Sequence, residues 1–182
     1  MTEPPTLPGG QRPPPEPDRA GVGLSAFADL KNYVFGSSAA IITDISLIVG
    51  LGSAQAGKGA ILGGLLTIAL ADNISDSLGI HLYKESEGCA ERLSRLATVL
   101  NFLSRLVISM SFVGIVIAWP VPQAVLIGTL WGLLLLTVLS YLITRSNHED
   151  SISEILKHVL VAVVVIALSR IVGALIAQYF AA

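Results

Sequence analysis

Hydrophobic residues along the chain fall into five long stretches separated by short polar segments. The stretches run at about Tyr33–Ser53, Gly59–Tyr83, Leu100–Trp119, Val121–Thr144 and Ile155–Phe180. Each is about 20 residues or longer, roughly the length that a helix needs to cross a ~30 Å hydrocarbon layer. Only helices and closed barrels satisfy their backbone groups in lipid, and these stretches lack the alternation of barrel strands. The pattern therefore predicts an all-α, polytopic membrane protein with five transmembrane helices.

The composition points the same way. Of the 182 residues, 53% are hydrophobic and 13% are charged, whereas a soluble domain carries about 25% charged residues. The net charge of −2 and the lack of a basic cluster predict no nucleic-acid partner. A single cysteine, Cys89, leaves no internal disulfide and no cysteine pair for a metal. No nucleophile–base pair is evident, so we expect neither enzyme activity nor a resident cofactor.

The polar segments predict the rest of the organisation. Residues 1–27 begin with a proline-rich stretch that has little to bury, so we expect a disordered tail there. Residues 28–182 make up the transmembrane domain. Within it, leucines recur at helical spacing over residues 85–99, which predicts a helical linker that leads into the third span at the cytoplasmic surface.

Lysine and arginine residues predict the orientation of the chain. Those on the side of the N-terminus are Lys31, Lys84, Arg92, Arg95, Arg145 and Lys157, and the opposite side has only Lys58. Positively charged loops stay in the cytoplasm. We therefore expect a cytoplasmic N-terminus, an outside C-terminus and a multi-pass location in the plasma or inner membrane of the cell.

Ionisable residues interrupt four of the predicted spans, and the one in the fifth, Arg170, lies toward the outer end of its helix, where snorkelling explains it. Asp44 lies in the first and Arg105 in the third, although a charge at a helix centre costs about 2.5–3.5 kcal/mol on insertion scales. In the second, Asp72 and Asp76 are four residues apart, so they project from one helix face. Asp44 and Asp72 each lie eleven residues from the inner end of their span. At 1.5 Å per residue, both are about 16 Å deep, close to the midplane.

Carboxylates at one depth suit a hard divalent cation. We predict metal ligands at Asp44, Asp72 and Asp76, with the Asn73 side chain assisting. Carboxylates in a dry site also hold protons more tightly, so metal binding would expel protons. The alternative is an interhelical ion pair between Arg105, about 10 Å deep on the same side, and Asp72 or Asp76. One arginine does not neutralise all three aspartates.

Secondary candidates lie nearer the cytoplasmic side. His81 and Glu85 are four residues apart and point away from the Asp72 face. They either bind metal at the cytoplasmic mouth or form a surface pair without metal. Glu87 either helps to concentrate cations near an entrance or is simply solvated. Arg105 completes this secondary set.

Two segments carry a resemblance to a known family. They are YVFGSSAAIITDISLIVGLGSA and GGLLTIALADNISDSLGIHLYKESEG. Together with the three later spans they resemble the membrane domain of the vacuolar iron transporter family, over most of residues 33–180. The resemblance implies a homodimer with a metal path between the first helices of the two protomers. It also implies that Fe²⁺ or Mn²⁺ leaves the cytoplasm in exchange for protons.

The chain departs from this family in its ligands within the membrane and in its cytoplasmic domain. The family's first-span aspartate falls near residues 38–40, where this chain has no carboxylate, and Asp44 lies about five residues further on. The family's second-span methionine falls at about Asp76, so the site here is richer in oxygen and favours Mn²⁺ or another oxygen-loving ion. The family's large cytoplasmic metal-binding domain is reduced to the short linker.

Two functions from different classes follow as hypotheses. The first is a dimeric Mn²⁺ or Fe²⁺ transporter that exports the ion from the cytoplasm in exchange for protons, with the lipid bilayer and a second copy as its partners. The second is a non-transporting membrane scaffold or accessory subunit, held together by structural buried ion pairs. Replacing the aspartates separates them, because only a transporter loses a metal-dependent property.

Overall fold

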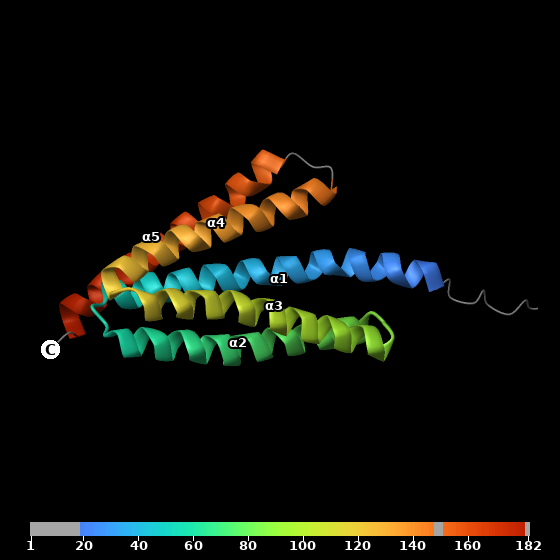
Figure 1. Ribbon diagram of the computed structural model, residues 1–182, viewed down its shortest axis with the longest axis horizontal. Coiled ribbons are helices and arrows are strands. Elements are labelled where there is room, and N and C mark those ends of the chain that lie inside the picture. Colours follow the sequence, from blue (N-terminus) through green and yellow to red (C-terminus); the bar gives the residue numbers. More distant parts are fainter. Residues whose placement is uncertain (1–18, 148–150, 181–182) are drawn as a thin grey trace, which may run out of the picture.

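Five α-helices make up the part of the chain that the computed structural model describes, residues 19–147 and 151–180 (Figure 1). They are α1 (Arg19–Ser53), α2 (Lys58–Ser86), α3 (Glu91–Ala118), α4 (Val121–Asn147) and α5 (Ser151–Phe180). Each contains a segment that is long and apolar enough to cross a membrane. The prediction of an all-helical, multi-pass membrane protein is confirmed at this level.

Two boundaries differ from those expected from the sequence. Helix α1 begins at Arg19, so residues 19–27 are helical although we predicted them as part of a disordered tail. The last proline of the tail is Pro17, and beyond it no residue blocks a helix. The earlier part of the tail lies outside the described residues. The predicted linker at 85–99 consists of the end of α2, a turn that contains Gly88 with φ 71°, and the first turns of α3.

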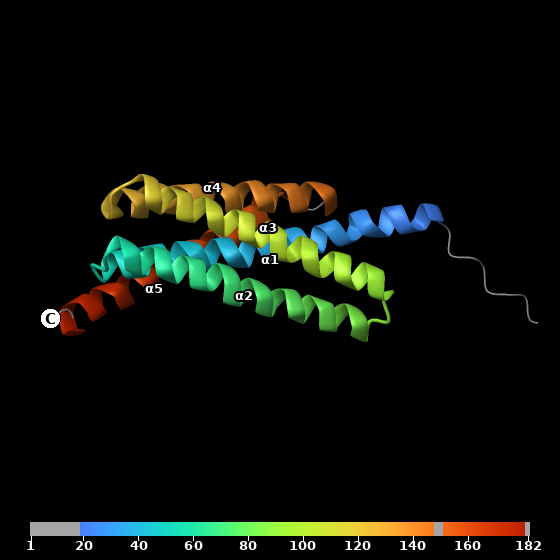
Figure 2. The same cartoon turned by 60° about the horizontal axis from the view of Figure 1, so that its bottom comes forward.

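Helix α1 is the central element of the bundle. The α2–α3 hairpin packs on one side of it and the α4–α5 pair on the other, so that α1 contacts all four other helices (Figures 1 and 2). The α1–α2 and α3–α4 turns lie together at one end, here called the α1–α2 end, and the opposite end is the α2–α3 end. Ser37 and Asp44 on α1 are therefore shielded from lipid by the surrounding helices.

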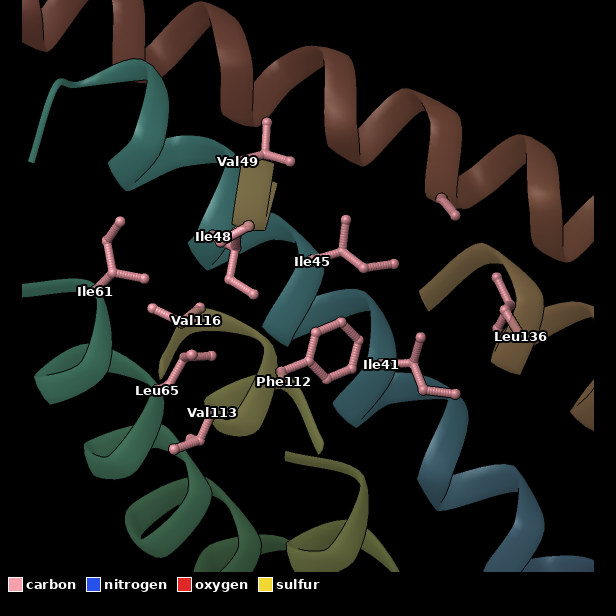
Figure 3. Packing of buried hydrophobic residues seen from close by; sticks show 12 residues of the cluster. Ile41, Ile45, Ile48, Val49, Ile61, Leu65, Phe112, Val113, Val116 and Leu136 are labelled. Atoms are coloured by element: carbon pink, nitrogen blue, oxygen red, sulfur yellow. The ribbon is translucent and has the colours of Figure 1, made fainter. Parts of the chain in front are cut away.

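The apolar core joins α1 to the helices on both sides. Its central members are Ile41, Ile45, Ile48, Phe112 and Leu136 (Figure 3). Glycines bring the backbones together: a Cβ at Gly132 would overlap Ile45, and one at Gly173 would overlap the carbonyl oxygen of Gly50. Close approach at small residues is typical of membrane helices, where van der Waals packing rather than water exclusion holds helices together.

Candidate functional site

Arg105 occupies the centre of the polar part of the bundle. Its side chain is 1% exposed, and Nη2 donates a hydrogen bond of 2.7 Å to Oδ2 of Asp72. Nη1 pairs with Oδ2 of Asp76 at 2.6 Å and donates to the carbonyl oxygen of Gly36 at 2.6 Å. Nε donates to Oδ1 of Asn73 at 2.9 Å. All three guanidinium nitrogens therefore have partners, supplied by α1 and α2.

This arrangement bears directly on the predicted ligand set. Asp72 and Asp76 face the same way, as their spacing requires, and the guanidinium of Arg105 reaches both of them from α3. The ion pair that we considered as an alternative is therefore present, and it includes both aspartates rather than one. The Asp72 and Asp76 side chains remain 41% and 45% exposed on the side away from Arg105.

Asp44 lies in the same region but is fully buried, with 0% exposure. Its Oδ2 accepts a hydrogen bond of 2.8 Å from Oγ of Ser109, and its Oδ1 has no hydrogen-bond partner in the described part of the chain. Ser109 follows Arg105 by one helical turn, about 6 Å along the axis of α3. Arg105 and Asp72 are close enough to act electrostatically on the Asp44 charge. The three predicted aspartates thus share one region, but only two of them are paired with Arg105.

The α1–α2–α3 interface is divided into a polar half and an apolar half. The polar half, toward the α2–α3 end, contains Ser37, Asp44, Asn73, Ser77, Lys84, Ser94, Asn101, Arg105 and Ser109. The apolar half, toward the α1–α2 end, contains Ile48, Val49, Ile61, Leu65, Phe112, Val113 and Val116. On α2 the change comes between Ala69 and Asn73. On α3 it comes between Ser109 and Phe112, so Asp44 lies where the two halves meet.

Neutral polar residues complete the polar half, and the sequence analysis missed Ser77, Asn101 and Ser109 among them. Nδ2 of Asn101 donates to Oγ of Ser77 at 3.2 Å, which ties α3 to α2. Besides the Asp44 oxygen, the unpartnered buried atoms among the described side chains are Nδ2 of Asn73 and Oδ1 of Asn101. The four-residue spacing of Asn101, Arg105 and Ser109 was the available signal, since it puts all three on one face of a helix.

A pocket of about 360 Å³ borders this network between α1, α2 and α3. Its lining includes Asp76 and Gly79 from α2, Asn101 and Arg105 from α3, and Gly36 from α1. The pocket brings one ion-paired carboxylate and the guanidinium to a space that holds more than a single water molecule, since liquid water takes about 30 Å³ per molecule. A small hydrated ion therefore has room beside Asp76.

The secondary candidates form short-range pairs near the α2–α3 end. Nε2 of His81 lies 3.5 Å from Oε1 of Glu85, and Nδ1 of His81 is hydrogen bonded to Oγ of Ser94 at 2.9 Å. The hydroxyl of Tyr83 donates to Oε1 of Glu87 at 2.6 Å. The His81–Glu85 contact corresponds to the surface pair that we weighed against a metal site, whereas Glu87 is hydrogen bonded to Tyr83 rather than simply solvated.

No metal-binding cluster is preformed in the described residues. Their side chains include no group of three or more His, Cys, Asp or Glu placed to hold an ion. The assignment of Asp44, Asp72, Asn73 and Asp76 as metal ligands therefore stays a prediction, and it requires Arg105 to move. No protein-family model, curated protein or solved structure matches this chain. The resemblance to vacuolar iron transporters likewise stays a prediction.

Proposed function

We propose that the chain is a transporter of a divalent cation, Mn²⁺ or Fe²⁺, which it exports from the cytoplasm across the plasma or inner membrane in exchange for protons. The observation that supports this best is the grouping of Asp44, Asp72, Asp76 and Arg105 in the polar half of a membrane-spanning bundle. Ionisable groups at such positions are costly, and they generally mark ion pathways and proton relays.

The charge of the group suits a divalent cation. Three carboxylates and one guanidinium leave two formal negative charges unbalanced when all are ionised. A divalent ion offsets both, whereas a monovalent ion offsets one. The side-chain atoms that contact Arg105 are oxygens of Asp72, Asn73 and Asp76. As metal ligands, oxygen atoms favour Mn²⁺ over softer ions.

Arg105 has a defined part in this proposal. In the described conformation it pairs with Oδ2 of Asp72 and Oδ2 of Asp76, so a metal ion has to displace its guanidinium to bind these two oxygens. A proton on either carboxylate also weakens that ion pair, because it removes the negative charge. Metal, proton and Arg105 therefore compete for the same oxygens, which is the physical basis for exchange of metal for protons.

The proposal includes a homodimer formed through α2. A row of small or short side chains lies exposed along α2 at four-residue intervals: Gly59, Gly63, Thr67, Ala71, Ser75 and Gly79. Rows of this kind allow two membrane helices to approach closely. The half-exposed Asp72 and Asp76 lie beside this row, and lipid does not solvate carboxylates. A second copy packed on α2 would cover both features, whereas α1 is already surrounded by its own chain. The proposed dimer therefore differs from the one between first helices that the resemblance implies.

Replacement of Gly63 by leucine tests this interface. We expect Gly63→Leu to shift the dimer toward monomer by about tenfold or more, because the side chain would keep the two α2 helices apart. Nothing lies within 4 Å of a Cβ built at Gly63, so the monomer should be unaffected. Single-molecule photobleaching in liposomes measures the ratio of dimer to monomer. Gly114→Leu on α3, where the space is equally open, is the matched control, and equal ratios for the two variants would exclude α2 as the interface.

The scaffold hypothesis is the second candidate, and one observation favours it. Arg105 is buried with every guanidinium nitrogen partnered, as a purely structural ion-pair network requires. Under that hypothesis the aspartates matter for stability alone. Under the transport proposal, conservative replacement of an aspartate removes a metal-dependent property from a protein that is still folded.

Reconstitution of the native chain into liposomes with an imposed pH gradient tests the transport proposal. We expect flux of Mn²⁺ or Fe²⁺ that depends on the gradient and exceeds that of protein-free liposomes, with Na⁺ and K⁺ not transported. If neither metal ion crosses the membrane of liposomes that contain correctly folded protein, the result favours the scaffold hypothesis.

A further inference from the structure

The boundary between the polar and apolar halves of the α1–α2–α3 interface lies at one level on all three helices. Each buried polar residue that is described on these helices lies on the side of the α2–α3 end. The side of the α1–α2 end is closed by large aliphatic and aromatic side chains, among them Ile61, Leu65, Phe112 and Val116 (Figure 3). Packing alone therefore distinguishes the two ends of the bundle.

The three unpartnered buried atoms all lie in the polar half, at successive depths. Asn101 is one helical turn from Arg105, which bonds Asn73, and a further turn separates Arg105 from Ser109, which bonds Asp44. The unpartnered atoms are Oδ1 of Asn101, Nδ2 of Asn73 and Oδ1 of Asp44. They are thus distributed over about two turns of α3, roughly 12 Å.

Buried polar atoms in folded proteins nearly always have a hydrogen-bond partner, either protein or ordered water. Neighbouring described side chains do not supply one at these three atoms, and lipid has no donors or acceptors at this depth. Water molecules satisfy such atoms when the site is polar and has room for them. The pocket of about 360 Å³, whose lining includes Asn101 and Arg105, supplies that room next to Asn101.

We propose that the polar half is a water-filled route that runs from the α2–α3 end to Asp44, and that the apolar half seals it from the α1–α2 end. Water binds along it at Asn101, Asn73 and Asp44. The predicted orientation makes the open end cytoplasmic. The inference rests on side-chain packing, on the unpartnered buried atoms and on the pocket, so it holds or fails independently of whether the chain transports a metal.

Two buried positions on the same face of α2 give a direct test. Ser77 lies in the polar half and Ala69 in the apolar half, eight residues away, and both are almost fully buried. In a Cys89→Ser background, Ser77→Cys and Ala69→Cys each introduce one small thiol. A thiol reacts as thiolate, which requires water. We expect a small membrane-impermeant methanethiosulfonate reagent, added on the side of the α2–α3 end, to modify Ser77→Cys at least about tenfold faster than Ala69→Cys.

The side of addition and a measurement on the native chain complete the test. The reagent added on the side of the α1–α2 end should leave Ser77→Cys unmodified if the seal is closed. In water-edited solid-state NMR of the unsubstituted protein in lipid, polarisation should reach Asn101 and Asn73 before Ile61 and Leu65. Equal modification rates for the two thiols, or water transfer that does not distinguish the two halves, would overturn the proposal.

Discussion

Replacement of Arg105 by glutamine is expected to lower the free energy of unfolding by about 3 kcal/mol. Removing one partner of a buried ion pair costs about 3–5 kcal/mol, because the remaining charge is left without compensation. We take the lower end of this range because Asp72 and Asp76 are half-exposed. Denaturant or thermal unfolding in detergent micelles measures the loss.

Two comparisons make this result specific to the ion pairs. In Arg105→Gln, additional replacement of Asp72 and Asp76 by asparagine should recover much of the lost stability, since no uncompensated charge remains. Arg95→Gln is the matched control, because Arg95 forms an exposed pair with Glu91 at 2.7 Å. Such a surface pair contributes at most about 1 kcal/mol. If Arg105→Gln were as mild as Arg95→Gln, the described network around Arg105 would be wrong.

Asp44→Asn is expected to abolish metal flux without loss of stability. Asparagine has nearly the same shape and still offers an oxygen to the hydroxyl of Ser109, so the 2.8 Å hydrogen bond can persist. It also removes any cost of a buried charge, so we expect the free energy of unfolding to stay the same or rise by about 1 kcal/mol. Flux should fall more than tenfold, because one of the proposed ligand charges is lost.

Loss of metal flux together with an unchanged free energy of unfolding identifies a functional aspartate. A residue that only stabilises the fold loses stability when it is replaced, whereas a functional residue is often retained at a cost to stability. Ser109→Ala is the companion variant, since it removes the hydrogen bond to Asp44 but keeps the carboxylate. If Asp44→Asn unfolded the protein as readily as Arg105→Gln, Asp44 would be assigned to the structural network.

The spans were predictable from hydropathy because lipid imposes a minimum length on every apolar segment that crosses it. The start of α1 was not, since residues 19–27 include two glycines, which are poor helix formers, and follow directly on the proline-rich tail. The helical lead-in to the third span was also expected, and α3 begins at Glu91 and continues through the apolar segment without a break.

The level of the three aspartates along the bundle was predictable from the sequence, but the partner that each side chain meets was not. Counting residues brought Asp44, Asp72 and Asp76 to similar levels, and their region is indeed shared. Counting residues does not give the rotation of each helix about its own axis. Because of that rotation, Arg105 contacts Asp72 and Asp76. Asp44 is instead hydrogen bonded to Ser109. Ser77, Asn101 and Ser109 were missed because the sequence analysis started from the charged residues and added only Asn73 beside them.

Mn²⁺ and Fe²⁺ uptake into proteoliposomes, compared between the native chain and Asp72→Asn under the same pH gradient, tests the proposed transport most directly. Asp72→Asn should insert normally and remain folded, since Arg105 keeps Asp76, Asn73 and the Gly36 carbonyl as partners. We predict gradient-driven flux through the native chain and its loss in the variant. Flux through Asp72→Asn equal to that of the native chain would contradict the assignment of the membrane carboxylates as the transport site.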